Sequence, residues 1–206
     1  MILHQVGGQA LLLEVPDAEQ VAALYARLLA ERAAGTLGEV AEIVPAARTV
    51  LLDGLARPRE LAKVLADWEP PAAPSTDGPL VEVPTVYDGA DLAEVARHWE
   101  LTAAEAVELH SGIEYRVAFC GFLPGFGYLT GLPAERAVPR RSTPRTSVPA
   151  GSVAVAGPYT GVYPRSSPGG WQLLGRTELR LWDSAREPAA LLAPGVRVRF
   201  VPVGAV

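Results

Sequence analysis

The sequence predicts an α+β domain followed by a mainly-β domain. In the first half, strand-like apolar runs alternate with two stretches whose apolar residues recur at helical spacing. In the second half, two short helices precede a series of short apolar runs separated by Gly and Pro. Such runs are typical of a β-barrel or sandwich. We therefore expect domains at residues 1–86 and 87–206 of the 206-residue chain, which is long enough to bury a real core.

Composition and charge argue against several classes of function. A formal net charge of −5 offers no general attraction to nucleic acid or anionic membrane. The single cysteine, Cys120, cannot form an internal disulfide or a thiolate metal cluster, which suits a reducing, cytoplasmic location. No apolar run reaches the roughly 20 residues of a membrane-spanning helix, and the start of the chain does not resemble a signal peptide. We therefore expect no metal, no nucleic acid and no membrane as partners.

The first domain is expected to follow the order β-α-β-β-α-β, which is that of a ferredoxin-like unit. Its first helix has Asp17 as a possible N-cap, with Gln20 three positions later as in a capping box. The last strand of the series is expected to close the sheet, and a Pro-rich linker or long loop at 69–79 precedes it. The expected strands and helices occupy residues 10–15, 16–35, 39–44, 48–54, 57–68 and 80–87.

The second domain is expected to begin with short helices at 90–99 and 102–112. The stretch "GFLPGFGYL" then places aromatic residues on a backbone broken by glycine and proline. Gly125 permits conformations that a Cβ would block, and Pro124 stiffens the turn. The aromatic residues either plug one end of the barrel as core or line a pocket there. They are Phe122, Phe126 and Tyr128.

A second unusual stretch, "VPRRSTPRTSVPAGSV", combines regularly spaced prolines with Arg140, Arg141 and Arg145. Each proline favours extended backbone in the residue before it. Arginine binds carboxylate or phosphate with two parallel hydrogen bonds. In an ideal strand Arg141 and Arg145 share a face, so Arg140 joins Arg145 only if the backbone bends. Pairing with surface carboxylates remains an alternative interpretation.

Two further features are candidates for the same site. In "GVYPRSSPGGWQLLGRT", Gly169 and Gly170 allow a sharp turn whose N–H groups could bind an anion, and Trp171 follows as core or site. His110, at the end of a predicted helix, is either structural or a proton shuttle near neutral pH. The sequence contains no G-x-x-x-x-G-K-[ST], no H-E-x-x-H and no G-x-S-x-G motif. It therefore shows no familiar way to bind ATP, hold a metal or activate a nucleophile.

Taken in this order, the three loops resemble the KipI / 5-oxoprolinase B-type family, whose members are also called allophanate hydrolase subunit 1. The resemblance runs without a gap from about Leu109 to Val203 and is looser in the N-terminal half. One departure is "VPTVYDGADLAEVA", which is shorter than the family's usual Gly-rich loop before the "DL" helix. The resemblance implies a ferredoxin-like domain followed by a cyclophilin-like β-barrel.

The resemblance also implies partners and a reaction. The B-type protein pairs with a C-type, KipA-like barrel protein, and the pair works with an A-type protein in the ATP-dependent cleavage of 5-oxoproline to glutamate. We expect Arg140 or Arg145 to hold the substrate carboxylate or a phosphorylated intermediate. The aromatic residues of "GFLPGFGYL" would wall the lactam ring, and His110 would transfer a proton.

Two other functions remain open. One family member inhibits a sporulation histidine kinase, so this chain is alternatively a kinase inhibitor without turnover. A fused form of the family belongs to urea carboxylase, so a subunit of an allophanate or urea amidolyase-like amide hydrolase is a further alternative.

Overall fold

The computed structural model describes residues 1–68 and 78–204. The chain forms two compact units, Met1–Asp77 and Gly78–Val206. The division therefore falls earlier than the predicted boundary after residue 86. Most of the predicted linker at 69–79, namely 69–77, lies outside the described residues.

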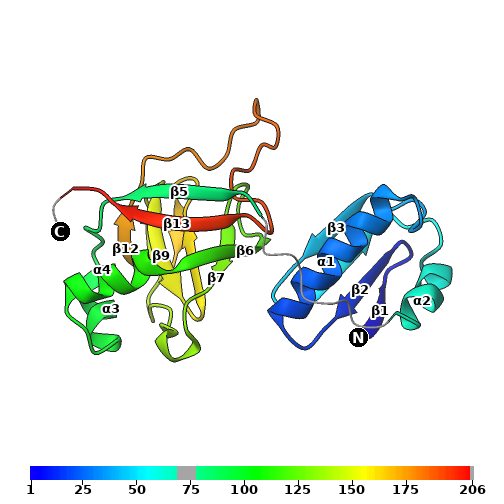
Figure 1. Cartoon of the computed structure of the whole chain (residues 1–206), viewed down its shortest axis with the longest axis horizontal. Helices are drawn as coiled ribbons and strands as arrows, with labels where there is room; N and C mark the ends of the chain where they lie inside the picture. The colour runs from blue at the N-terminus through cyan, green and yellow to red at the C-terminus, as the bar shows by residue number, and fades with distance from the viewer. Residues whose placement is uncertain (69–77, 205–206) are drawn as a thin grey trace. The chain divides into compact units, whose positions relative to one another are not determined.

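The first unit is an antiparallel sheet of order β1-β2-β4-β3 with two helices (Figure 1). The N-terminus of α1 has the predicted cap, because Asp17 Oδ1 accepts a hydrogen bond from Gln20 N at 2.8 Å. Leu24 and Leu28 of this helix are buried against the sheet core. The elements are β1 (Ile2–Val6), β2 (Ala10–Glu14), α1 (Ala18–Ala33), β3 (Glu42–Pro45), β4 (Thr49–Asp53) and α2 (Pro58–Ala66).

The predicted ferredoxin-like order is not confirmed. The strand expected to close the first sheet, β5 (Leu80–Thr85), instead pairs in parallel with β13 (Arg197–Pro202) of the second unit. The edge beside β2 is filled by β1, which pairs with β2 as an antiparallel hairpin. The sequence does not reveal β1 as a strand, because four of its five side chains are exposed and no apolar alternation marks it. The prediction that β5 completes the first sheet is therefore wrong.

The second unit is a mainly-β structure, as predicted, built on a sheet of order β12-β9-β10-β7-β6-β13-β5. A two-stranded ribbon of β11 and β8 lies outside that order. Helices α3 and α4 pack against β12 and β13 respectively (Figure 1). The remaining elements are α3 (Leu92–His98), α4 (Ala103–Gly112), β6 (Glu114–Cys120), β7 (Gly127–Thr130), η1 (Ala134–Arg136), β8 (Arg145–Val148), β9 (Ser152–Ala156), β10 (Tyr159–Val162), β11 (Ser167–Gly169) and β12 (Gln172–Arg176).

The sheet nearly closes into a barrel. Just beyond β5, Val86 and Arg176 exchange backbone hydrogen bonds at 2.9 and 2.8 Å, which joins the two ends of the sheet. A Cβ at Gly175 would lie 2.2 Å from the carbonyl oxygen of Val86, so this junction requires glycine. That this barrel is of the cyclophilin-like type remains a prediction from the family resemblance.

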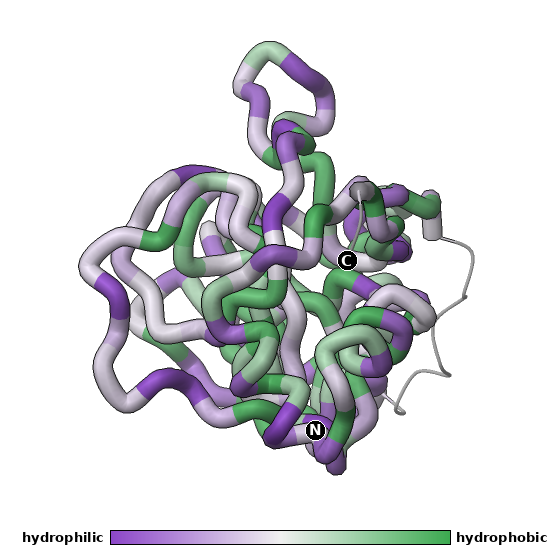
Figure 2. Tube along the Cα trace, turned by 90° about the vertical axis from the view of Figure 1, so that its left-hand side faces the viewer, coloured by the Kyte–Doolittle hydropathy of each residue, from purple (hydrophilic) through white to green (hydrophobic). Residues whose placement is uncertain are grey.

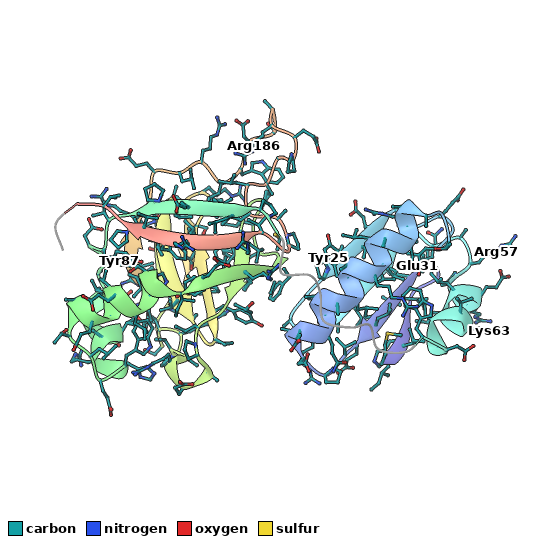
Figure 3. All side chains as sticks on the ribbon, viewed as in Figure 1. Tyr25, Glu31, Arg57, Lys63, Tyr87 and Arg186 are labelled. Carbon is teal, nitrogen blue, oxygen red and sulfur yellow. The ribbon has the colours of Figure 1, made fainter. Side chains whose placement is uncertain are left out.

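In Figure 2 the outer loops are mainly purple or white, that is hydrophilic or neutral, with shorter hydrophobic stretches between them. One loop projects from the barrel after Trp182 and contains Arg186, which is labelled in Figure 3. The Arg186 guanidinium donates to the carbonyl oxygens of Leu181, Pro188 and Ala189 and so ties the base of the loop together. No helix in residues 1–68 and 78–204 is both long and apolar enough to span a bilayer.

Candidate functional site

The stretch "GFLPGFGYL" forms a tight turn between β6 and β7. Backbone hydrogen bonds from Leu123 N to Gly121 O at 2.7 Å and from Phe126 N to Leu123 O at 2.9 Å close it. Phe122 occupies the left-handed region with φ of 66°, although 59% of the residue is exposed. A large residue in that region is strained, and such strain is found most often where function requires it. Phe122 is therefore the one aromatic side chain of this turn that is open to solvent.

Phe126 lies in the core, which contradicts the expectation that it forms a pocket wall. Only 1% of it is exposed, although it stands between two glycines. Its ring makes edge-on contacts at centroid distances of 5.1–5.5 Å with four aromatic rings. These rings belong to Phe122, Tyr128, Tyr163 and Trp171. Trp171, with 5% exposed, belongs to the same core cluster.

Gly125 allows the turn to pack closely against neighbouring residues, as predicted. Gly125 has φ of 83°, and a Cβ there would lie 2.9 Å from Cβ of Trp182 and 3.4 Å from Cβ of Pro164. Pro124 beside it is exposed. The turn thus seats its glycine against a neighbouring loop while presenting Phe122 outward.

Two arginines of the second stretch converge on one buried carboxylate. Arg141 Nη1 and Arg145 Nη2 each donate to Asp91 Oδ1 at 2.8 Å. The other oxygen, Asp91 Oδ2, accepts from the backbone N–H of Leu173 at 2.7 Å. The Asp91 side chain is 3% exposed, whereas those of Arg141 and Arg145 are 32% and 22% exposed. Arg141 precedes β8, and bends at residues 142 and 143 separate it from Arg145, so the two side chains do not meet on one strand face. The alternative interpretation, in which the arginines pair with a carboxylate, holds for these two, and that carboxylate is buried.

Asp91 is held in its charged form. Burial raises the pKa of this carboxyl group, but the hydrogen bonds from Arg145 and Leu173 N, with the charges of Arg145 and Arg141, outweigh it. The net result is a pKa below the ordinary value for aspartate. Asp91 thus presents a fixed negative charge to two guanidinium groups at neutral pH.

The third stretch supports these arginines from the opposite strand. In the β8–β11 ribbon, Gly169 lies across from Arg145, and the carbonyl oxygen of Gly170 accepts from Arg141 N at 2.8 Å. A Cβ at Gly169 would lie 2.3 Å from Oη of Tyr163, so glycine is needed there for the tyrosine to pack. Neither glycine has a positive φ, so the expected anion-binding turn of N–H groups is not formed. Their role is to place Tyr163 and the arginine strand.

Arg140 extends the positive charge to the exposed side of this cluster. Among the described residues no ion pair involves it, and its side chain is exposed. Burial raises the pKa of the Tyr128 hydroxyl, and the charge of Arg140 opposes that rise. Burial also raises the pKa of Tyr163, opposed by the backbone hydrogen bond from Trp171 and by the charges of Arg140 and Arg145. Arg140 therefore acts on both tyrosines, and Arg145 acts on Tyr163.

His110 lies in the barrel interior, where its surroundings do not fit the proton transfer predicted for it. It is fully buried, with ring centroids of Tyr115 and Phe200 at 5.2 and 4.7 Å. Its Nδ1 lies 2.8 Å from Oη of Tyr87, which is labelled in Figure 3, and its Nε2 lies 3.4 Å from Oγ1 of Thr160. Burial lowers the pKa of His110 to about 3. A histidine held neutral across physiological pH does not fit a proton shuttle, so its place in the core corrects that expectation.

The sequence pattern did not reveal the role of Asp91. An aspartate just before a short apolar helix suggests an N-cap, and Asp91 does precede α3, but its side chain forms no capping hydrogen bond. Its carboxylate instead joins segments 50 and 54 positions away. The available signal was the group of three arginines at 140, 141 and 145, which indicated an acidic partner without identifying it.

The comparisons with known proteins agree on one family. Residues 1–192 match the family described as "Carboxyltransferase domain, subdomain C and D". Over 138 residues the chain is 54% identical to the B-type subunit of 5-oxoprolinase from Escherichia coli O157:H7, covering 66% of this chain and 63% of that protein. Over 146 residues it is 44% identical to the protein of the same name from Bacillus subtilis (strain 168), covering 69% of this chain and 58% of that one. The matches thus span about three fifths of these relatives' length.

Solved structures extend the likeness to nearly the whole chain. TTHA0988 is 36% identical with a TM-score of 0.77, covering 96% of this chain and 40% of that one. The uncharacterized protein PH0987 from Pyrococcus horikoshii is 32% identical with a TM-score of 0.59, covering 98% of this chain and 97% of that one. Urea carboxylase from Kluyveromyces lactis has a TM-score of 0.74 at 18% identity, covering 98% of this chain and 22% of that one. At that identity the likeness bears on the fold alone.

Proposed function

Because the chain belongs to the carboxyltransferase domain family, subdomains C and D, and is akin to the B-type subunit of 5-oxoprolinase, we propose that it is a component of an ATP-dependent 5-oxoprolinase. The observation that carries this proposal is the 54% identity over 138 residues to a protein of that name. The proposed reaction opens the lactam ring of 5-oxoproline to give glutamate. The chain contributes binding groups to it and does not act alone.

The arginine cluster suits the proposed substrate. 5-Oxoproline carries one carboxylate beside a lactam ring, and an arginine fork binds a carboxylate through two parallel hydrogen bonds. Arg145 is positioned by Asp91, and Arg140 is exposed and acts, like Arg145, on the hydroxyl of Tyr163. Phe122 and Tyr128 offer aromatic surface nearby. The ring of Phe122 contacts Tyr163, on which Arg140 and Arg145 act, and Arg140 also acts on Tyr128. In this proposal the arginines hold the carboxylate and the aromatic residues flank the ring.

Ring opening also requires activation of the amide carbonyl, which ATP would supply. The sequence contains no glycine-rich phosphate loop of the G-x-x-x-x-G-K-[ST] type. We therefore assign the nucleotide, as co-substrate, to the assembly with the A-type and C-type proteins. His110 is left out of the chemistry because its ring is buried and neutral.

The purified chain alone is expected to release no glutamate from 5-oxoproline, with or without ATP and Mg²⁺. Co-expression with its A-type and C-type partners is expected to give a co-purifying complex that releases glutamate only when ATP is present. A coupled glutamate assay measures both. If the co-purified complex is inactive on 5-oxoproline, the proposed function is wrong. A complex that hydrolyses allophanate would support the amide-hydrolase alternative, and inhibition of a sensor kinase by the single chain would support the inhibitor.

Arg145→Ala is expected to lower kcat/KM of the assembled enzyme more than tenfold. A lost charge-assisted hydrogen bond to a bound anion costs about 1.5–3 kcal/mol, and about 1.4 kcal/mol corresponds to a factor of ten. Arg141 remains on Asp91, so the buried carboxylate keeps a partner. Arg32→Ala, an exposed position in the last turn of α1, is the control and should leave kcat/KM unchanged. Equal kcat/KM of Arg145→Ala and Arg32→Ala would mean that Arg145 has only a structural role.

A further inference from the structure

The charges around Asp91 do not balance. One carboxylate faces two guanidinium groups, since Arg141 and Arg145 both donate to its Oδ1. Its Oδ2 is taken by the backbone N–H of Leu173, so neither oxygen is left without a partner. Asp91, Arg141 and Arg145 together therefore have a surplus of one positive charge. Buried or half-buried cations are normally paired, so this surplus calls for an anion.

The hydrogen-bond donors are also in surplus. Within the described part of the chain, Arg141 Nε and Arg145 Nη1 are buried and have no hydrogen-bond partner. Buried polar atoms almost always have a partner in native proteins, and each one left without costs roughly 1–3 kcal/mol. Both side chains are partly exposed, at 32% and 22%, so the guanidinium pair borders solvent although these two nitrogens do not. The pair thus combines two donors that no protein group accepts with an edge that an anion can approach, and contact with those donors requires a small movement of the arginine side chains.

We propose that Asp91 is a positioning residue that holds Arg141 and Arg145 side by side as a binding site for the carboxylate of one small monoanion. Arg141, which sequence reasoning left outside the substrate-binding set, becomes a binding residue with Arg145. Two guanidinium groups and one carboxylate leave a single positive charge, which a monocarboxylate neutralises and a phosphate dianion exceeds. The site deepens the proposed function and rests on it only for the identity of the ligand, 5-oxoproline.

The test uses the purified chain without its partner proteins. Its melting temperature is measured against rising concentrations of 5-oxoproline, acetate, 2-pyrrolidinone and inorganic phosphate at constant ionic strength. A ligand that binds the native state raises the melting temperature in a concentration-dependent way. We expect saturable shifts with 5-oxoproline and acetate and none with 2-pyrrolidinone, which has the lactam ring but no carboxylate. A shift with phosphate alone, or no shift with either carboxylate, would overturn the proposal.

Arg141→Lys and Arg145→Lys separate binding from folding. Each keeps a positive charge near Asp91 and removes the planar fork, so the fold is expected to persist while the apparent Kd for 5-oxoproline rises about tenfold. Asp91→Asn is expected to abolish the ligand-induced shift, because the arginines lose the carboxylate that aligns them. Should Asp91→Asn fail to fold, the two lysine variants still decide. Ligand-induced shifts as large as those of the parent in both lysine variants would refute the site.

Asp88→Asn is the matched control for Asp91. Asp88 Oδ2 accepts from Arg176 Nε at 2.9 Å, but the two side chains are 48% and 56% exposed. We expect this variant to keep the full carboxylate-induced shift; loss of the shift there would show that the response is unspecific and would overturn the site. The outcome is also independent of the enzyme assay. Carboxylate binding by the chain, with no glutamate release by the complex, would sustain the site and reject the proposed function.

Discussion

Phe126→Ala is expected to lower the free energy of unfolding by about 3–5 kcal/mol, the usual cost of cutting a buried phenylalanine to alanine. Phe126 is 1% exposed, and its ring lies at the centre of the four edge-on aromatic contacts. Its removal therefore takes away both buried surface and the ring contacts of its neighbours. Thermal and urea unfolding measure the loss, which should appear as a melting temperature lower by about 10 °C or more.

Phe122→Ala is the matched control in the same turn. Phe122 is 59% exposed and touches the cluster only at its edge, through Phe126 and Tyr163. Its truncation should change the free energy of unfolding by less than about 1 kcal/mol, because little apolar surface returns to water. If the two variants melt together, or if Phe126→Ala keeps the parent's melting temperature, the aromatic cluster does not hold the barrel as described.

The contrast between these residues shows what sequence pattern can reveal here. Short apolar runs broken by Gly and Pro correctly predicted a β-rich second unit, because strand periodicity and turn residues are local signals. The same local signals could not decide that Phe126 points inward and Phe122 outward. That difference depends on a left-handed backbone at Phe122, with φ of 66°, which residue type does not predict.

Which strands pair with each other could not be predicted from the local sequence pattern either. The sequence indicated that β5 is a strand, but not which sheet it joins. Pairing of β5 with β13 links residues more than a hundred positions apart, for example Leu80 with Arg197. The first unit is instead completed by β1, whose exposed side chains carry no strand signal. Order along the chain favours neighbouring pairings; the β1–β2 hairpin follows that rule, whereas the pairing of β5 with β13 does not.

The sequence predicted only part of the candidate site. Three arginines on a proline-stiffened segment in an acidic chain were candidates for anion binding, and the structure brings Arg141 and Arg145, and not the predicted Arg140, onto one carboxylate. The carboxylate that unites them, Asp91, comes from a segment 50 positions away and was not among the predicted site residues. Asp91 also accepts from Leu173 N of β12, so it ties the start of α3, the arginine strand and a barrel strand at one point. A residue with that many partners orders the site before any ligand arrives.

The barrel interior contains a polar network that should make stability depend on pH. His110 is fully buried with a pKa of about 3, whereas an unfolded histidine titrates near its ordinary value of 6.5. A neutral imidazole has one donor and one acceptor nitrogen, and the hydroxyls of Tyr87 and Thr160 lie at its two nitrogens. Burial also raises the pKa of Tyr87 and Tyr115, so these hydroxyls stay protonated around it. The network is therefore neutral when folded, and a proton on His110 would be an unpaired buried charge.

Between pH 6.5 and pH 3 the unfolded chain binds a proton at His110 that the folded chain does not, so stability is full above pH 6.5 and is lost as the pH falls toward 3. The expected loss from this group is about 2 kcal/mol by pH 5, at roughly 1.4 kcal/mol per pH unit below the unfolded pKa. Urea unfolding of the parent and of His110→Gln at pH 7, 6 and 5 measures it, and the difference between the two curves removes the contribution of carboxyl groups. The glutamine variant is less stable at pH 7 but should lose less stability on acidification.

The control is His98→Gln, at an exposed histidine that hydrogen-bonds Ala137 O at 2.9 Å; its stability should follow that of the parent at each pH. Parallel curves for the parent and His110→Gln would mean that His110 accepts a proton in the folded barrel, and the account of a neutral buried network would be wrong.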